Sequence, residues 1–364
     1  MSREQNAWRL LDTGVRRAAE NMAMNRALLE GHQEKVTPHT LRFLQFTPCA
    51  LLGFHQSAEQ ELKIDYCQAN GVDIQRRMTG GGAIYFDQTQ LGWELYLDKQ
   101  TLGTADMGAI AKRICEAAAR AISKLGVGAK FRPRNDIEVD GKKISGTGGA
   151  FDGDSILYQG TLLLDFDVGR MMRVLNIPAE KLSDKAIASA QERVANLKDL
   201  IGKLPDMDEV KKIIADEFAA EFGVSFTPSN EINADEEKLY QQALAEMDTA
   251  EWVYQHNRPV TEAPTLSSVI KFDGGLVRTN VLLDTSKNRI KQLWLTGDFF
   301  VKPRRLVADL EAALRDTAIA DLDANVTRFF ADYGAEMLLL KPEDFVTAIQ
   351  AALDTVNQAE MENA

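Results

Sequence analysis

Two glycine-marked segments of the sequence contain residue types that could bind and activate an anionic substrate. In the first, residues 76–87, two arginines precede the run Gly80-Gly81-Gly82. Consecutive glycines let the backbone approach a ligand closely, and successive backbone N–H groups can form a concavity for an anion. Arg76 or Arg77 would supply positive charge there. The spacing is not that of a Walker loop or a dinucleotide fingerprint. A glycine run between strands is by itself more often a flexible hairpin than an anion site.

The second segment, residues 134–146, predicts a β-hairpin that carries a lysine on its polar face. Asp140-Gly141 between two alternating runs is typical of a two-residue turn. This turn pairs Val139 with Lys142, Glu138 with Lys143, Ile137 with Ile144 and Asp136 with Ser145. Side chains alternate between the two faces of a strand. We therefore expect Ile137, Val139 and Ile144 on the core face. The polar face would carry Asp136, Glu138, Lys143 and Ser145. A bulge would reverse this assignment, and the plain alternative is an exposed Glu138–Lys143 ion pair worth about 0.2–1 kcal/mol.

Composition narrows the class of protein. The chain has 364 residues and a formal net charge of −12, which argues against nucleic acid as a partner because such a surface would be basic. No apolar run approaches the roughly 18 residues of a membrane span, and the polar start lacks a signal segment. We therefore expect a cytoplasmic protein that does not bind membranes. The cysteines Cys49, Cys67 and Cys115 and the four histidines show no zinc-site spacing.

The elements that must position the two segments follow from hydrophobic periodicity. Helices are predicted over residues 8–30, 59–70, 107–125 and 208–222, and strands over residues 41–46, 50–53, 72–76, 83–86 and 92–97. A second unit is predicted to contain strands over residues 269–272, 275–283 and 290–296 and helices over residues 301–314 and 342–356. Pro259 and Pro264 mark the boundary. We expect a catalytic domain over residues 1–250, a linker over 251–264 and a small accessory domain over 265–364.

Three motifs, in this order and spacing, resemble the lipoate–protein ligase family within the biotin/lipoate ligase and octanoyltransferase superfamily. They are RRMTGGGAIYFD (76–87), RNDIEVDGKKISG (134–146) and QGTLLLD (159–165). WRLLDTG (8–14), NMAMNRALL (21–29) and, more weakly, RVANL (193–197) support the resemblance. It implies an α+β fold of mixed sheets packed with helices, followed by a small C-terminal α+β accessory domain, as in single-chain lipoate ligases.

The resemblance implies a two-step reaction. The enzyme would activate free lipoate with ATP and Mg²⁺ to lipoyl-AMP, because a carboxylate is a poor acyl donor and adenylation makes AMP the leaving group. It would then pass the lipoyl group to a lysine of a lipoyl carrier domain, from a 2-oxoacid dehydrogenase E2 protein, a glycine-cleavage H-type protein or a specialised lipoyl protein. A fixed cation and oriented N–H groups would stabilise the charge that develops.

The resemblance also assigns residues by motif. Lys143 is the implied catalytic residue, bridging the lipoate carboxylate and the α-phosphate. Binding of ATP and the adenylate is implied for Arg77, Gly82, Ala83, Ile84, Tyr85, Asn135, Asp136 and Lys143. Binding of lipoate is implied for Arg77, Gly81, Lys143, Gly160 and Thr161. Asp136 is the implied magnesium ligand.

Two alternative functions stay open. The nearer is an octanoyl- or lipoyl-transferase that uses a cysteine nucleophile instead of ATP. Residues 116–200 contain no cysteine, and Cys115 falls inside a predicted helix. The other is a non-enzymatic protein that binds a lipoyl domain or an acyl ligand, suggested by Phe86 and Gln159, which stand where the family often has histidine.

Overall fold

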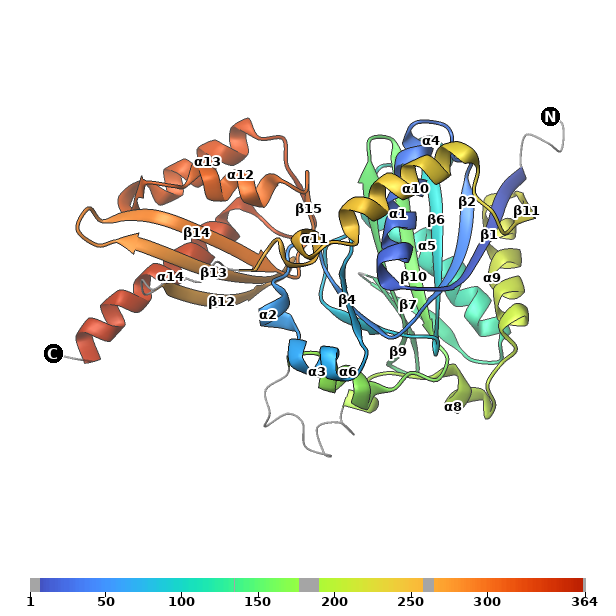
Figure 1. Cartoon of the computed structure of the whole chain (residues 1–364). Helices are drawn as coiled ribbons and strands as arrows, with labels where there is room; N and C mark the ends of the chain where they lie inside the picture. Colours follow the sequence, from blue (N-terminus) through green and yellow to red (C-terminus); the bar gives the residue numbers. More distant parts are fainter. Residues whose placement is uncertain (1–6, 134, 177–189, 258–264, 363–364) are drawn as a thin grey trace. The chain divides into compact units, whose positions relative to one another are not determined.

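The computed structural model describes residues 7–133, 135–176, 190–257 and 265–362, and the chain divides into two compact units (Figure 1). The first unit takes its described residues from Met1–Leu51, Leu62–Met78 and Ile84–Val253. The second takes them from Leu52–Glu61, Thr79–Ala83 and Tyr254–Ala364. The polar start, Arg134 and the two boundary prolines lie outside the described residues. The predicted domain limits stay a prediction.

The first unit is built on a mixed eight-stranded sheet. Its strands follow the order β11-β1-β2-β6-β10-β9-β8-β7. Their bounds are β1 Ala7–Arg16, β2 Thr40–Phe46, β6 Gln90–Asp98, β7 Ala129–Arg132, β8 Asp136–Val139, β9 Lys142–Asp152, β10 Ser155–Leu163 and β11 Ser225–Ser229. β1 runs parallel to β2 and β11, whereas the pairs from β2 through β6 and β10 to β9, β8 and β7 are antiparallel. The mixed sheet with helices confirms the predicted α+β class.

Helices cover both faces of this sheet. The helices of the first unit are α1 Ala18–Gln33, α3 Ile64–Ala69, α4 Lys99–Leu102, α5 Met107–Lys124, α6 Val168–Val174, α8 Leu197–Ile201, α9 Met207–Phe222, α10 Ala234–Met247 and α11 Ala250–Tyr254. On β6, Trp93 and Leu95 join one buried cluster with α5 and α9, while Tyr96 joins a second cluster with α1 and α10. Alternation along the strand therefore packs a separate helix pair on each face.

A smaller sheet in the order β4-β3-β5 contains the arginine motif. Its strands are β3 Cys49–Leu52, β4 Asp73–Arg76 and β5 Ile84–Phe86. β3 and β5 run antiparallel, with Cys49 opposite Phe86 and Leu51 opposite Ile84. The predicted strands on either side of the glycine run are thus confirmed.

The predicted helix over residues 8–30 is wrong in its first half. Residues Ala7–Arg16 form β1, and the helix begins only at Ala18. Trp8 and Leu10 pack on one face of the sheet and Leu11 on the other, which is the alternation of a strand buried on both faces. The helical spacing of the apolar residues was coincidental, because pairing with β2 and β11 decided the structure.

A buried ion pair between β2 and β6 is hydrogen-bonded to α1. The Arg42 guanidinium lies 3.0 Å from a carboxylate oxygen of Glu94, and both residues are at most 2% exposed. Asn25 Nδ2 and Tyr96 OH donate to the same carboxylate at 2.6 Å and 2.8 Å, and Arg42 donates to Asn21 Oδ1 at 2.6 Å. Each charge is therefore compensated where water cannot reach it.

The second unit contains a four-stranded antiparallel sheet in the order β12-β13-β14-β16 and a two-stranded pair, β15 with β17. Its elements are α2 Ala58–Glu61, β12 Leu266–Phe272, β13 Gly275–Asp284, β14 Arg289–Gly297, β15 Val301–Lys302, α12 Leu306–Ala313, β16 Thr317–Ala318, η3 Ile319–Asp321, α13 Leu322–Asp332, β17 Glu336–Met337 and α14 Pro342–Glu362. Residues of α12, α13 and α14 pack with β13 and β14 in one core. The predicted strands are confirmed, but the helix predicted from Val301 begins at Leu306, because Val301 and Lys302 pair with β17.

Two histidines in the first unit share a chain of hydrogen bonds. His32 Nδ1 lies 2.6 Å from Ser155 Oγ, and His32 Nε2 lies 2.9 Å from His39 Nδ1. Burial, with a smaller contribution from His39, lowers the pKa of His32 from 6.5 to about 4. Lys35 and Asp98 are the other charged groups that act on this pair. The folded protein therefore keeps His32 neutral near pH 5, where the unfolded chain would bind a proton.

We predict that stability falls as the pH drops from 7 to 5. The unfolded state binds more protons than the folded state in this range, so His32 alone should cost about 2 kcal/mol of unfolding free energy. Urea unfolding at both pH values should show this loss, and the loss should be smaller in His32→Gln. An identical pH dependence in the two proteins would contradict the role of His32.

Candidate active site at the β7–β8–β9 hairpins

Three neighbouring strands place charged residues in one row at the edge of the large sheet. Arg132 of β7 lies opposite Asp136 of β8, and Asp136 lies opposite Gly146 of β9. The predicted pairs of Glu138 with Lys143 and of Val139 with Lys142 are confirmed. The predicted pairs beyond them are wrong, because the register shifts between Ile137 and Glu138.

This bulge changes which side chain faces the polar side. With Ile144 as the extra residue, Ser145 rather than Ile144 lies opposite Ile137. Ser145 is completely buried, as are Ile137 and Ile144, so the prediction that Ser145 belongs to the polar face is wrong. Gly146 takes the place opposite Asp136 that the simple hairpin gives to Ser145.

The lack of a side chain at Gly146 leaves room for the ammonium group of Lys143. A Cβ atom at Gly146 would lie 2.8 Å from Lys143 Nζ and 2.9 Å from Lys143 Cε. The lysine side chain therefore runs over the backbone of Gly146 and reaches Asp136 Oδ1, 2.8 Å from its Nζ. Its side chain stays 39% exposed, so the amine is held and still accessible to a ligand.

A second segment fixes the backbone of Lys143. Lys143 N donates to Arg193 O at 2.9 Å, and Ala195 N donates to Lys143 O at 2.8 Å, which forms a parallel bridge to Val194. Asn196 anchors this segment through two hydrogen bonds with the backbone of Phe166. The RVANL motif thus supports the lysine from the side of β9 that β8 does not occupy.

Asp136 is shared between two cations. Its Oδ2 lies 2.5 Å from Arg132 Nη2, while its Oδ1 contacts Lys143. Burial works to raise the pKa of Asp136, but Lys143 and then Arg132 hold that pKa below its ordinary value. The carboxylate is therefore ionised at neutral pH.

Each oxygen of Asp136 lies in an ion pair, and its role as magnesium ligand stays a prediction. Glu138 lies two residues further along β8, and its Oε2 is 3.3 Å from Arg132 Nη1. Within the described ranges, no group of three or more His, Cys, Asp and Glu side chains could hold a metal ion.

No described helix is long and apolar enough to cross a membrane.

Asn135 and Thr147 brace the start of β8. Thr147 N and Oγ1 donate to Asn135 O at 2.8 Å and 3.0 Å, and Asn135 Nδ2 donates back to Thr147 O at 2.9 Å. Thr161 Oγ1 accepts from Gly146 N at 3.3 Å. The structure therefore brings Asn135, Asp136, Lys143 and Thr161 together around one short stretch of β9.

Gly160 has a packing explanation. A Cβ atom there would lie 2.1 Å from the Trp93 indole, so the ring occupies the space of a side chain. Trp93 is only 1% exposed and belongs to the core cluster. The lipoate-binding role implied for Gly160 stays a prediction.

The two arginines of the first motif lie at the end of β4, Arg76 as its last residue and Arg77 directly after it. Arg76 donates to Val253 O at 2.7 Å, and Arg77 Nη1 donates to Leu51 O at 3.0 Å. Burial, together with the neighbouring charge of Arg77, lowers the pKa of Arg76 to about 9, and burial lowers the pKa of Arg77 to about 10. Both guanidinium groups remain charged at neutral pH, and burial would make an anion that reached Arg77 interact strongly with it.

Tyr85 points its side chain inward. It is 2% exposed, and its hydroxyl donates to Asp87 Oδ2 at 2.8 Å. Burial, followed by this bond, raises the pKa of Tyr85 well above its ordinary value. Ile84 beside it is 37% exposed. The predicted contribution of these two residues to nucleotide binding would come through the backbone.

The glycine run belongs to the second unit, together with residues 52–61. A Cβ atom on Gly80 would lie 2.3 Å from Phe299 O, and a Cβ atom on Gly53 would lie 1.8 Å from Gly81 O. Gly81 has a φ of 93°, which favours glycine. Close packing thus explains part of the run, and the ligand roles implied for Gly81, Gly82 and Ala83 stay predictions.

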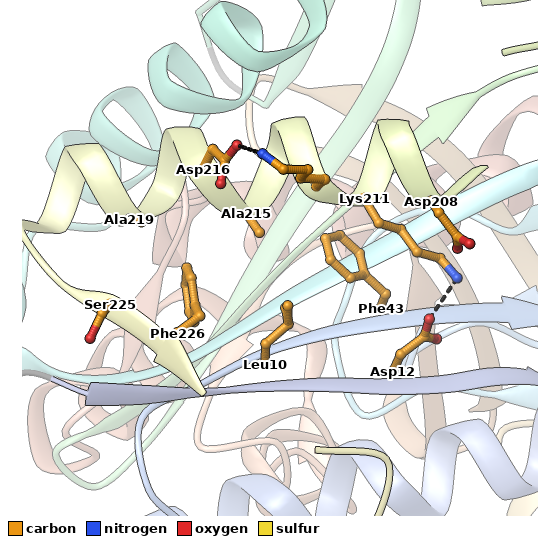
Figure 2. A pocket seen from close by; sticks show the side chains of 11 residues that line it. Leu10, Asp12, Phe43, Asp208, Lys211, Ala215, Asp216, Ala219, Ser225 and Phe226 are labelled. Atoms are coloured by element: carbon orange, nitrogen blue, oxygen red, sulfur yellow. Dashed lines mark hydrogen bonds and ion pairs between the residues drawn. The ribbon is translucent and has the colours of Figure 1, made fainter. Parts of the chain in front are cut away.

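A hollow of about 490 Å³ lies elsewhere in the first unit, between α9 and strands β1, β2 and β11 (Figure 2). Leu10, Phe43 and Phe226 form its apolar floor. Lys211 crosses it to Asp12, with 2.7 Å between Nζ and the carboxylate. None of the residues predicted for the site lines this hollow.

Sequence reasoning missed three residues around the lysine: Arg132, Gly146 and Thr147. Arg132 could have been found from the alternation of charge on β7 and β8, had the β7 strand been predicted. The bulge that brings Gly146 opposite Asp136 has no clear signal in the sequence, because an even hairpin satisfies the same pattern.

For the reaction that the sequence resemblance implies, we predict that Gly146→Ala lowers acyl-adenylate formation at least tenfold with little effect on folding. The new methyl group would displace the flexible end of Lys143 and would not meet backbone. Gly148→Ala is the matched control, because a Cβ atom at Gly148 on the same strand meets nothing within 4 Å. Adenylate yield and thermal unfolding should be measured for both variants. Equal loss in both, or none in Gly146→Ala, would contradict this geometry.

Comparison with known proteins shows to which family the chain is similar. Residues 17–219 match the lipoyl protein ligase A/B catalytic domain. The chain is 29% identical over 272 residues to the octanoyltransferase LipM of Kyrpidia tusciae, covering 68% of this chain and 98% of that protein. It is 28% identical over 268 residues to lipoate–protein ligase 1 of Staphylococcus aureus, covering 73% and 77%.

Solved structures of similar fold agree with this family match. A chain from a bipartite lipoate protein ligase of Thermoplasma acidophilum, described with its E2 lipoyl domain, has a TM-score of 0.60 at 28% identity and covers 70% of this chain and 99% of that one. A lipoate–protein ligase A bound with ATP has a TM-score of 0.59 at 25% identity, covering 68% and 98%. LipL1 of P. falciparum, solved in complex with lipoate, is 17% identical to this chain and shares its fold with a TM-score of 0.70. The match covers 91% of this chain and 96% of LipL1. The family match over more than half of the sequence, with the three motifs in place, shows that this chain belongs to the lipoyl protein ligase A/B catalytic domain family.

Proposed function

We propose that this protein is an ATP-dependent lipoate–protein ligase that forms lipoyl-AMP and transfers the lipoyl group to a lysine of a lipoyl carrier domain. Its relatives include both ligases and octanoyltransferases, so family membership leaves the choice of acyl donor open. One observation carries the proposal: none of the three cysteines has the surroundings of a nucleophile.

Each cysteine is a buried, free thiol. Burial raises the pKa of Cys49 well above its usual value and the pKa of Cys67 to about 11. Cys115 lies close to the hairpin, with its Sγ 3.3 Å from both Thr147 Oγ1 and Tyr158 OH. Burial raises the pKa of this thiol too, and those two hydroxyls lower it only in part. A catalytic thiolate needs partial exposure and a depressed pKa, so these thiols favour chemistry without a cysteine acyl-enzyme.

The first step would join lipoate to the nucleotide. A carboxylate oxygen of lipoate attacks the α-phosphorus of ATP, the new P–O bond forms, and pyrophosphate leaves with the electrons of the broken bond. Lys143 would lie between the carboxylate and the α-phosphate, where its charge offsets the repulsion between two anions and then the charge on the five-coordinate phosphorus. Asp136 and the glycine beneath it would hold the amine at this position.

The second step would acylate the carrier. The neutral amine of a carrier lysine attacks the carbonyl carbon of lipoyl-AMP, an amide bond forms, and AMP leaves as the phosphate anion. The amine gives up its proton to solvent. Lys143 would stabilise the developing oxyanion and the departing phosphate. The carrier is proposed from the Thermoplasma acidophilum protein, which was described with an E2 lipoyl domain.

The assignments of Arg77, Asn135 and Thr161 to substrate contacts belong to this proposal. Arg77 offers a buried positive charge, and Thr161 lies beside the backbone of Gly146. ATP and lipoate are proposed as substrates because family structures were solved with each of them. Magnesium is proposed as the partner of the nucleotide phosphates, with Asp136 as the carboxylate that would bind it.

We predict that Lys143→Ala folds normally and loses at least about 100-fold in lipoate-dependent ATP–pyrophosphate exchange, the scale of losing one transition-state donor. Lys142→Ala is the matched control, because Lys142 is exposed and lies opposite Val139. It should retain the exchange rate within about twofold, as surface changes usually do. Normal exchange by folded Lys143→Ala would refute the role of Lys143.

Cys115→Ser separates the ligase from the transferase. The serine hydroxyl can keep the contacts to Thr147 and Tyr158 but cannot replace a catalytic thiolate. The proposal expects carrier modification to survive in this variant. Loss of modification in a folded Cys115→Ser protein would support the transferase instead.

A further inference from the structure

We propose that Arg132 is a positioning residue that keeps Asp136 paired when Lys143 turns from Asp136 to the anionic groups of the substrate. The inference rests on the proposed function and deepens it, because it concerns how the site releases its lysine. Arg132 lies on β7, outside the three motifs that carry the family resemblance.

The geometry gives each cation its own oxygen. Lys143 Nζ contacts Asp136 Oδ1 at 2.8 Å, and Arg132 Nη2 contacts Asp136 Oδ2 at 2.5 Å. The Asp136 side chain is only 19% exposed. Lys143 can therefore leave without displacing Arg132, and the carboxylate keeps a counter-ion in a place where water supplies little compensation.

The arginine is itself held in place. It is the direct cross-strand partner of Asp136, and its Nη1 lies 3.3 Å from Glu138 Oε2. A planar guanidinium can bridge two carboxylates at once, which a single ammonium cannot do with fixed orientation. The four charges of Arg132, Lys143, Asp136 and Glu138 sum to zero before substrate arrives. When Lys143 neutralises a substrate anion, Arg132 stays between the two carboxylates that remain.

Without Arg132, the same movement is harder. Lys143 would be the sole cation on a largely buried carboxylate, and separating the two would leave that charge unpaired. The fraction of molecules with Lys143 turned toward the substrate would fall, and the rate would fall with that fraction. The loss should appear in kcat for adenylation, because in this proposal Lys143 turns after both substrates have bound and Arg132 itself touches neither ATP nor lipoate.

The test is steady-state kinetics of lipoate-dependent pyrophosphate release by the full chain. We expect Arg132→Gln to lower kcat about tenfold while KM for ATP and KM for lipoate change less than about twofold. Arg132→Lys should recover part of the lost kcat, because a cation opposite Asp136 is restored although an ammonium cannot also bridge to Glu138. Lys130→Gln is the matched control: it removes one positive charge from the same strand, and Lys130 is exposed. It should behave like wild type.

Three results would overturn the inference: wild-type kcat in Arg132→Gln, no recovery in Arg132→Lys, or a raised KM for ATP with unchanged kcat, which would mean that Arg132 contacts the nucleotide. An equal loss in Lys130→Gln would reduce the effect to general charge and would also overturn it. Failure of the proposed function looks different. In that case the wild-type protein itself releases no pyrophosphate with lipoate.

Discussion

Lys143 can reach Asp136 only because the residue beneath its side chain has no Cβ atom. A methyl group at Gly146 would lie within 3 Å of the last two atoms of the lysine. The bulge between β8 and β9 brings this glycine opposite Asp136, and the Arg193–Ala195 backbone prevents β9 from shifting back. Bulges often re-aim a side chain next to an active site, and here the bulge moves Ser145 into the core and leaves the polar side to the lysine. The place of Lys143 beside Asp136 follows from this register, and the pairing of β7 with β8 adds Arg132 to the same carboxylate.

The relatives include octanoyltransferases and lipoate–protein ligases, and we propose that the surroundings of a few side chains distinguish the two activities here. A transferase needs a thiol that ionises easily, whereas a ligase needs a cation between two anions. The chain has buried thiols of raised pKa and a half-exposed lysine amine beside an ionised aspartate. The same sheet buries Cys115 against Thr147 and Tyr158 and leaves the Lys143 amine partly exposed.

Local pattern predicted much of this structure, and long-range pairing accounts for what it missed. The Asp140-Gly141 turn, the face of Ile137 and Val139 and the α5 and α9 helices follow from short-range rules, and all are confirmed. The predicted helix at Trp8 failed because β1 lies between two parallel strands contributed by distant residues. The pairing predicted for Ile144 and Ser145 failed for a similar reason. The register of β9 against β8, and not the polarity of Ser145, decides which face its side chain occupies. Glycines show the limit most clearly: Gly160 makes room for Trp93, which no local motif reveals.

The most direct measurement is the intact mass of an apo lipoyl domain after incubation with this protein, lipoate, ATP and magnesium. The account predicts a gain of one lipoyl group that requires ATP and is lost when Lys143 is replaced by alanine. A gain without ATP, supplied instead by an octanoyl carrier protein, would contradict the ligase and identify a transferase. No gain from either donor would contradict catalysis of lipoylation on that carrier and favour the non-enzymatic binding protein.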